Sequence, residues 1–322
     1  MRIAISGAGV AGPALAFWLL RTGHEPTLIE TAPQLRTGGY VIDFWGVGYT
    51  VAERMGVLPS IRAAGYAVKE LRFVDAHGRK SGGFDVRVFR RLLGDRFISL
   101  PRGDLAAQIY RLVDDQVETL FDTSITALED HDSGVRLSLN GSDRDFDLVI
   151  GADGLHSNVR RLAFGAEQQF ERRLGYHVAA FETEGYRPRD ELVYVSHGLP
   201  GLQIARFALR NDRTMFLFVI AEEHFGGSEP RDVAERKAAL RRVFQHFGWE
   251  WPAIAARLDA APDVYIDRVS QIVMDRWSNG RACLIVSGLL SPFAFTRRVL
   301  SAGARRPIPR AEVRPGARSA TG

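Results

Sequence analysis

Residues 2–12, which read Arg-Ile-Ala-Ile-Ser-Gly-Ala-Gly-Val-Ala-Gly, decide the fold of this chain. A short β-rich run leads directly into a Gly-x-Gly-x-x-Gly turn, and the Ala- and Leu-rich segment that follows predicts a helix to about Arg21. Thr22-Gly23 ends this helix, and a second strand over residues 26–29 leads to Glu30. A strand, a glycine turn, a helix and a second strand in this order predict a dinucleotide-binding unit.

The spacing of the glycines gives each of them a role. Gly7 makes the tight turn, Gly9 lets a diphosphate approach the backbone, and Gly12 lets the helix pack closely on the strand. The start of the helix also presents unpaired N–H groups to an anion. The alternative is a glycine-rich turn that binds nothing, followed by an exposed Glu30. The residues expected to bind the diphosphate are Gly7, Ala8, Gly9, Val10, Ala11 and Gly12.

Glu30 narrows the choice of dinucleotide. It lies 18 residues after Gly12, at the end of the second strand, where a carboxylate can accept hydrogen bonds from the hydroxyls of an adenosine ribose. The same negative charge would repel the 2′-phosphate of NADP. The dinucleotide held by this motif is therefore expected to be FAD or NAD.

The composition excludes several classes of protein. The chain has 322 residues, of which 46% are hydrophobic and 25% charged, which is typical of a globular protein. A single cysteine, Cys283, can form neither an internal disulfide nor a cysteine-rich zinc cage, so we expect a cytoplasmic protein. No apolar stretch approaches the ~20 residues of a membrane span. The net charge of +4 comes from seven arginines after residue 286, so a nucleic-acid surface is not expected.

Beyond the first unit, the pattern predicts many short strands and a few helices. An antiparallel sheet is expected over residues 176–221, where four extended runs are separated by turn-like segments. The other expected strands are residues 40–44, 68–75, 81–88, 119–128, 134–139 and 146–150, with a strand pair at 264–274 and 282–286. The other expected helices are residues 48–63, 101–114, 230–247 and 252–258.

Residues 147–160 carry the most specific motif, Asp-Leu-Val-Ile-Gly-Ala-Asp-Gly-Leu-His-Ser-Asn-Val-Arg. This segment resembles the fingerprint of the flavoprotein aromatic hydroxylases, the single-component FAD-dependent monooxygenases that include p-hydroxybenzoate hydroxylase and the tetracycline-inactivating monooxygenases. In that family the aspartate serves both FAD and NADPH binding. The resemblance places Asp153 and Gly154, with Ser157 and Arg160, near the pyrophosphate. Alternatively, Asp153 only caps the helix that follows it.

Two arginines extend the resemblance toward the flavin. Residues 98–105 are similar to the family's helix start, at which an arginine lies along the flavin side of FAD, and this implies that role for Arg102. A planar guanidinium also suits a diphosphate. A surface ion pair between Arg102 and Asp104 is the alternative. Arg36 is placed like the arginine that approaches the flavin ring in the tetracycline-inactivating members.

The resemblance implies an α/β protein with a Rossmann-like FAD-binding domain and an inserted antiparallel-sheet substrate domain. The FAD-binding domain would comprise residues 1–66, 95–165 and 268–290, the substrate domain 67–94 and 166–267, and residues 291–322 a disordered tail. FAD would be the cofactor and NADPH or NADH the co-substrate, and O₂ would supply oxygen to an aromatic or polycyclic phenolic small molecule. The sequence leaves the catalytic residues and the oligomeric state open.

The substrate wall is expected on the antiparallel sheet, although ordinary core packing is the better explanation for each of its aromatic residues. His177 and His197 could activate a phenol as bases, but a single histidine in a strand usually has a structural role. The aromatic residues in question are Phe181, Tyr194, Phe207, Phe216 and Phe218.

The resemblance ends after Val286. The family continues there with a Gly-Asp motif that binds FAD, whereas this chain reads Ser287-Gly288-Leu289 and has no aspartate after Asp275. The remaining residues are rich in Arg, Ala, Pro and Gly, which suggests a frameshift near residue 287 that sequencing of the gene would test. Three functions therefore stay open: a flavin hydroxylase, a flavin reductase or dehydrogenase of the same fold, or an inactive relic with weakened FAD binding.

Overall fold

A six-stranded sheet forms one half of the molecule. The computed structural model describes residues 1–36, 39–226 and 229–285. The strand order of this sheet is β17-β18-β11-β1-β2-β7, and all neighbours are parallel except β17 and β18. Because β1 lies between β2 and β11, the chain order reverses at β1, which is where ligands bind in open α/β sheets. The strands are β1 (Arg2–Ser6), β2 (Glu25–Ile29), β7 (Glu118–Leu120), β11 (Leu148–Gly151), β17 (Ser278–Asn279) and β18 (Ala282–Leu284).

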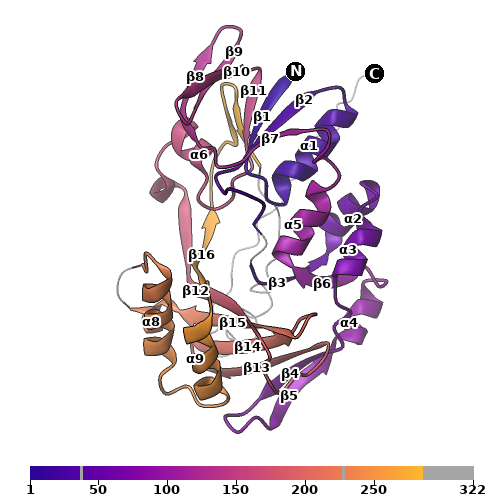
Figure 1. The fold of residues 1–322 in the computed structure, drawn as a ribbon, viewed down its shortest axis with the longest axis vertical. Helices are drawn as coiled ribbons and strands as arrows, with labels where there is room; N and C mark the ends of the chain where they lie inside the picture. Colours follow the sequence, from indigo (N-terminus) through magenta and orange to yellow (C-terminus); the bar gives the residue numbers. More distant parts are fainter. Residues whose placement is uncertain (37–38, 227–228, 286–322) are drawn as a thin grey trace, which may run out of the picture.

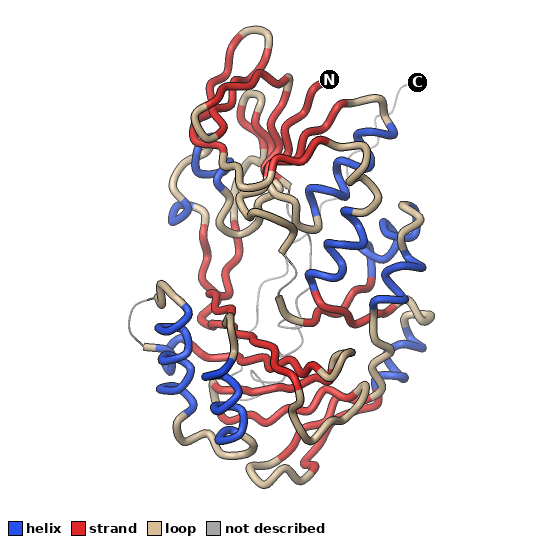
Figure 2. The backbone as a smooth tube through the Cα atoms, in the orientation of Figure 1, coloured by secondary structure: helices blue, strands red, loops and turns tan. Residues whose placement is uncertain are grey.

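Both faces of the parallel sheet are covered, as its almost continuously apolar strands predict. Ile3 and Ile5 point to the side of helices α1 (Ala11–Arg21) and α5 (Arg102–Tyr110), and Ala4 points to the other side. That second side packs against a three-stranded antiparallel sheet (Figure 2). Its strands are β8 (Ile125–His131), β9 (Gly134–Leu139) and β10 (Ser142–Phe146), in the order β10-β9-β8.

A seven-stranded sheet forms the other half, at the bottom of Figure 1. Its order is β16-β12-β15-β14-β13-β4-β5, and β12 to β15 form the antiparallel sheet that the sequence predicts. The long strands β12 and β16 run side by side toward the parallel sheet (Figure 1). The bounds are β4 (Glu70–Val74), β5 (Lys80–Asp85), β12 (Glu171–Glu184), β13 (Val193–Leu199), β14 (Leu202–Ala208), β15 (Arg213–Ala221) and β16 (Tyr265–Ile272).

The two faces of this larger sheet have different neighbours. Helices α8 (Val233–Phe244) and α9 (Trp251–Ala260) cover one face. The other face packs against the ribbon of β3 (Val41–Trp45) and β6 (Phe97–Pro101), where Phe207 and Met215 contact Val41 and Phe97. The shorter helical segments are α2 (Gly46–Arg54), α3 (Leu58–Ala64), α4 (Val86–Leu92), α6 (Asn158–Ala163), α7 (Glu222–Phe225) and the 3₁₀ turn η1 (Glu167–Gln169).

The α/β fold class is confirmed, while several element predictions were wrong. The helix expected over residues 48–63 is two helices, because Gly56 adopts a φ of +75° between them. The strand expected to reach Val88 ends at Asp85, whose carboxylate accepts from the Arg87 amide and starts α4. Residues 119–128 hold two strands, and β6 and β10 were not predicted. The strands expected as a pair, β16 and β18, lie in different sheets.

The division into domains stays a prediction, and its boundary at residue 267/268 falls inside β16. The predicted tail, 291–322, and the segment from Ser287 that replaces the Gly-Asp motif lie outside the described residues. Within the described part of the chain, none of the helices has the length and apolar character needed to cross a bilayer.

Candidate functional site

The glycine turn lies at the carboxyl end of β1, directly against the end of β11. Gly7 has a φ of +104°, and a Cβ added to it would lie 2.7 Å from the carbonyl oxygen of Ala152. A Cβ on Gly12 would lie 1.9 Å from the carbonyl oxygen of Gly7, so the close packing predicted for Gly12 is present. At Gly9, by contrast, an added Cβ would meet nothing within 4 Å. The turn is therefore tight at its two ends and open at its centre.

Glu30 extends from the end of β2 toward this turn and is buried, with 9% of its surface exposed. Its Oε2 accepts a hydrogen bond from the Ala8 amide at 2.9 Å, and its Oε1 accepts from the Ala32 amide at 2.9 Å. The alternative of an exposed glutamate does not hold. The backbone of the glycine turn instead fixes the carboxylate beside the start of α1.

Asp153 lies in the turn that follows β11 and does cap α6. Its Oδ2 accepts from the amides of Asn158 at 2.8 Å and Val159 at 3.1 Å, and from the Ser6 hydroxyl at 3.1 Å. Its Oδ1 is buried and has no hydrogen-bond partner among the described residues. A buried carboxylate oxygen without a donor is costly, and a ligand hydroxyl or a water molecule would satisfy it. Gly154, with a φ of +78°, continues the turn.

The other two residues of this fingerprint support the turn. Ser157 is the N-cap of α6 and accepts from the Arg160 amide at 3.0 Å. The Arg160 side chain is only 2% exposed, donates to the Leu155 carbonyl at 2.6 Å and pairs with Glu167 at 3.0 Å. Its Nη2 thus already has partners inside the protein, whereas its Nε is buried without a hydrogen-bond partner among the described residues. A direct contact between Arg160 and a pyrophosphate stays a prediction.

Arg102 and Arg36, the two arginines expected to contact the flavin, have different neighbours: Arg102 lies beside Tyr40, and Arg36 lies beside Glu30. The Arg102 amide donates to the carbonyl of Tyr40 at 3.1 Å, and the residue is exposed at the start of α5. Among the described residues no ion pair joins it to Asp104, as the alternative had required. Arg36 pairs with Glu30 at 3.6 Å, and its side chain is 75% exposed. The predicted contacts of both arginines with a flavin are untested.

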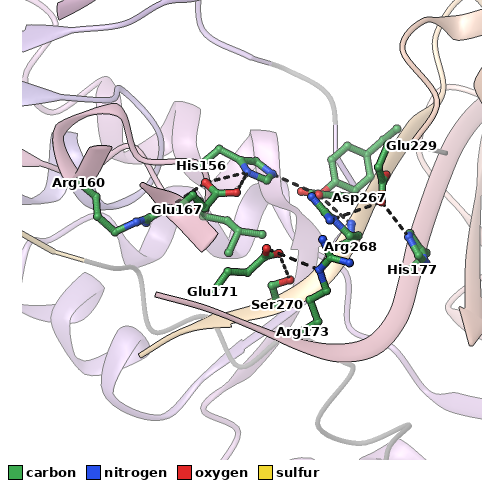
Figure 3. A network of polar contacts seen from close by, with 12 residues as sticks. His156, Arg160, Glu167, Glu171, Arg173, His177, Glu229, Asp267, Arg268 and Ser270 are labelled. Carbon is green, nitrogen blue, oxygen red and sulfur yellow. Dashed lines mark hydrogen bonds and ion pairs between the residues drawn. The ribbon is translucent and has the colours of Figure 1, made fainter. Parts of the chain in front are cut away.

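The middle of the fingerprint contains a histidine, His156, whose contacts were not predicted from the sequence. Nδ1 of His156 lies 3.0 Å from Glu167, and Nε2 lies 3.3 Å from Asp267 in β16 (Figure 3). The hydrogen bond to Asp267, together with that to Glu167, raises the pKa of His156 to about 9 against the opposing effect of burial. Asp267 is 111 residues away in sequence, so no local pattern could have indicated the pair.

No protein-family model matches the chain. An uncharacterised protein of Mycobacterium tuberculosis is 37% identical over 295 residues, covering 88% of this chain and 76% of the relative. A flavin-dependent monooxygenase from an unidentified prokaryote is 32% identical over 293 residues, covering 88% of this chain and 73% of the relative. The chain belongs to the flavin-dependent monooxygenases. The crystal structure of the tetracycline destructase Tet(51) matches this monooxygenase with a TM-score of 0.78 at 30% identity, over 91% of this chain and 76% of that one.

The aromatic residues of the monooxygenase's predicted substrate wall belong to two hydrophobic core clusters, on opposite faces of the seven-stranded sheet. Phe181, Phe216 and Phe218 pack on the face that α8 and α9 cover. Phe207 and Tyr194 lie on the opposite side, in the cluster with β3 and β6. The core explanation is therefore confirmed for Phe181, Phe216, Phe218 and Phe207, and the partly buried Tyr194 packs against the cluster of Phe207.

Both candidate histidine bases of the monooxygenase are buried among fixed neighbours. His177 stacks on Phe225 with ring centroids 3.8 Å apart, and its Nε2 lies 3.3 Å from Glu229. Nδ1 of His197 lies 2.8 Å from the Val74 carbonyl. These contacts agree with the structural role expected for a histidine in a strand.

Proposed function

We propose that this monooxygenase binds FAD at the carboxyl edge of its parallel sheet and uses NADPH or NADH and O₂ to hydroxylate an aromatic or polycyclic phenolic small molecule. The observation that carries the proposal is the open centre of the glycine turn at Gly9, with Glu30 fixed at one side and the unpartnered Oδ1 of Asp153 at the other. The residues present therefore fit a dinucleotide.

The adenosine half would occupy the edge formed by β1 and β2. The diphosphate would lie over Gly9, where the amides at the start of α1 favour an anion. Glu30 would accept from the ribose hydroxyls, since carboxylate oxygens can take further donors beside the two amides already bound. Its charge disfavours a 2′-phosphate, so NADPH, if used, would bind elsewhere as a transient co-substrate.

The flavin half would lie near Arg102. When bound, FAD supplies the redox chemistry that uses a nicotinamide donor and O₂. The chain contributes an apolar, aromatic wall there: Tyr265 faces Tyr40 with ring centroids 6.0 Å apart, and Ala180 is the strand neighbour of Tyr265. Such a wall orients a flat substrate and excludes water from the reacting atoms.

The likeness to Tet(51) supports a substrate class. That protein is by its name a tetracycline destructase, and tetracyclines are polycyclic phenols. An aromatic wall and an adjacent guanidinium suit a flat, electron-rich molecule of this kind. We therefore propose polycyclic phenols as the first substrates to try.

A titration of the purified full chain with FAD tests the proposal, with Gly9→Ala as the decisive variant. The added methyl meets no protein atom, so the thermal midpoint should stay unchanged, whereas FAD affinity should fall by at least about tenfold because the methyl occupies the diphosphate's space. Gly82→Ala, in edge strand β5, is the matched control, since its Cβ would meet only ordinary contacts at 3.7 Å.

The outcomes separate the three candidate functions. A wild-type protein that is colourless once unbound FAD has been removed contradicts the proposal and leaves the inactive relic. A yellow protein that incorporates ¹⁸O from ¹⁸O₂ into a phenol supports the hydroxylase. Saturation of a substrate double bond without incorporation of oxygen would instead support the reductase or dehydrogenase.

A further inference from the structure

Charged contacts made by His156 join the loop that follows β11 to strand β16 of the seven-stranded sheet (Figure 3). The imidazole of His156 lies between two carboxylates, with Nδ1 3.0 Å from Glu167 and Nε2 3.3 Å from Asp267. His156 belongs to the loop between β11 and α6, whereas Asp267 belongs to β16 of the other sheet. One side chain therefore connects the two halves next to the proposed cofactor turn.

The carboxylate of Glu167 is held firmly on its other side. Glu167 also accepts from the guanidinium of Arg160 at 3.0 Å, and that guanidinium is almost completely buried. Arg160 in turn donates to the carbonyl of Leu155, the residue before His156. Arg160 thus contacts both Glu167 and the loop between β11 and α6, which carries Asp153 and His156. The position of His156 is therefore determined by the turn that carries Asp153.

From Asp267 in β16, a series of contacts continues toward Arg102. Asp267 accepts from the Tyr265 hydroxyl at 3.2 Å, and the Tyr265 ring faces Tyr40. The Tyr40 carbonyl accepts from the Arg102 amide at 3.1 Å. The two ends of the proposed FAD site, at Asp153 and at Arg102, are thus joined through β16.

We infer that His156 is a positioning residue, whose charged imidazole fixes the Asp153 turn against β16 and so aligns the two ends of the cofactor site. The inference rests on the proposed function. The charge is present at neutral pH, since hydrogen bonding to Asp267 and then to Glu167 raises the pKa of His156 to about 9 although burial opposes it. The charged or titratable groups around the imidazole are Glu167 from η1, Asp267 and Tyr265 from β16, and Arg160 from α6.

The test is FAD affinity of the full chain between pH 7 and pH 10, for the wild type and His156→Gln. Glutamine can still form a hydrogen bond but carries no charge, so the variant should bind FAD about tenfold more weakly at pH 7. A histidine whose pKa is raised contributes fully below the ordinary value of 6.5, and the contribution is lost as the pH rises from there to the raised value of about 9. Wild-type affinity should therefore fall toward that of the variant as the pH rises through about 9.

His131→Gln is the matched control. His131 also faces a carboxylate, that of Asp145 at 3.6 Å, but both residues lie in the three-stranded sheet. This variant should bind FAD like the wild type at every pH. Asp267→Asn removes the opposite partner and should weaken binding by the same factor, while the double variant with His156→Gln should weaken it no further.

Each outcome decides the inference. If His156→Gln keeps the wild-type affinity, or if the wild type and His156→Gln share the same decline above pH 8, His156 has no positioning role. If the substitutions prevent folding, a wild-type affinity that does not change as the pH rises through about 9 still overturns the inference. If the wild type binds no FAD, both the proposed function and the inference are wrong. If the wild type binds FAD but the variants do not show the expected affinities, only the inference is wrong.

Discussion

At the scale of single residues, Glu30 stabilises the fold at the same place where it is expected to bind a ligand. Its carboxylate accepts from the amides of Ala8 and Ala32, so the glycine turn and the end of β2 are tied together through one side chain. A carboxylate held by two amides loses little conformational freedom when a ribose binds, which favours tight binding.

Asp43 offers a prediction at the same scale. It lies in β3 between the two halves, and burial raises its pKa to about 6, although the Ser99 hydroxyl, donating at 2.7 Å, acts in the opposite direction. The folded protein therefore holds a proton that the unfolded chain has released between pH 3.8 and about 6, and stability falls as the pH rises through this range. Asp43→Asn should raise the free energy of unfolding at pH 7 by about 1 to 2 kcal/mol.

Urea denaturation at pH 7 and at pH 3 would measure this effect. The gain should disappear at pH 3, where the wild-type carboxyl is protonated in both states. Asp114→Asn, an exposed position after α5, should change nothing at either pH. A loss of stability in Asp43→Asn at pH 7 would show that the charged carboxylate is the favoured form.

At the scale of elements, the two side chains that cap α6 make it possible to distinguish helix capping from ligand binding. Both Ser157 and Asp153 accept from amides in its first turn. Ser157→Ala should lower the free energy of unfolding by about 1 kcal/mol and leave FAD affinity unchanged. Asp153→Ala should lower the free energy of unfolding by a similar amount. It should also weaken FAD binding, since it removes the unpartnered Oδ1 as well. Thermal unfolding with and without FAD measures both quantities, and equal effects of the two variants on FAD binding would contradict this division.

The same scale shows what the sequence could and could not predict. The glycine turn, Glu30 and the Asp153 turn were predictable because each acts through backbone geometry within a few residues. Strand β6 was missed because it is only five residues long and leads directly into α5, so that its last residue, Pro101, was assigned to the helix expected over residues 101–114. His156 was missed because its partner Asp267 comes from a distant strand, and only the tertiary fold brings them together.

At the scale of the whole molecule, we expect a group of ion pairs around β4, near one edge of the seven-stranded sheet, to contribute to stability in acid. Arg72 pairs with Glu70 at 2.8 Å and with Asp190 at 2.7 Å, and Lys80 pairs with Glu70 at 2.6 Å. Hydrogen bonds from Arg72 and then Lys80 lower the pKa of Glu70 to about 2. A lowered carboxyl pKa contributes stability above the unfolded value of 4.5, and this is lost as the pH falls toward about 2.

Glu70→Gln should therefore reduce the slope of stability against pH between pH 4.5 and about 2. Glu191→Gln is the control, because its carboxylate also pairs with an arginine but is 64% exposed. Unfolding followed by circular dichroism in a pH series measures the slope. An unchanged slope in Glu70→Gln would place the source of acid sensitivity elsewhere.

The interleaving of the chain between the two sheets has a consequence for how the protein is made. Strand β11 leaves the ribosome long before β18, its parallel neighbour, and β12 long before β16. During translation, each sheet therefore has an apolar strand edge awaiting a partner that has not yet been synthesised. Such late, long-range pairing slows folding and exposes nascent chains to aggregation. Expression of this chain should depend strongly on chaperones and low temperature.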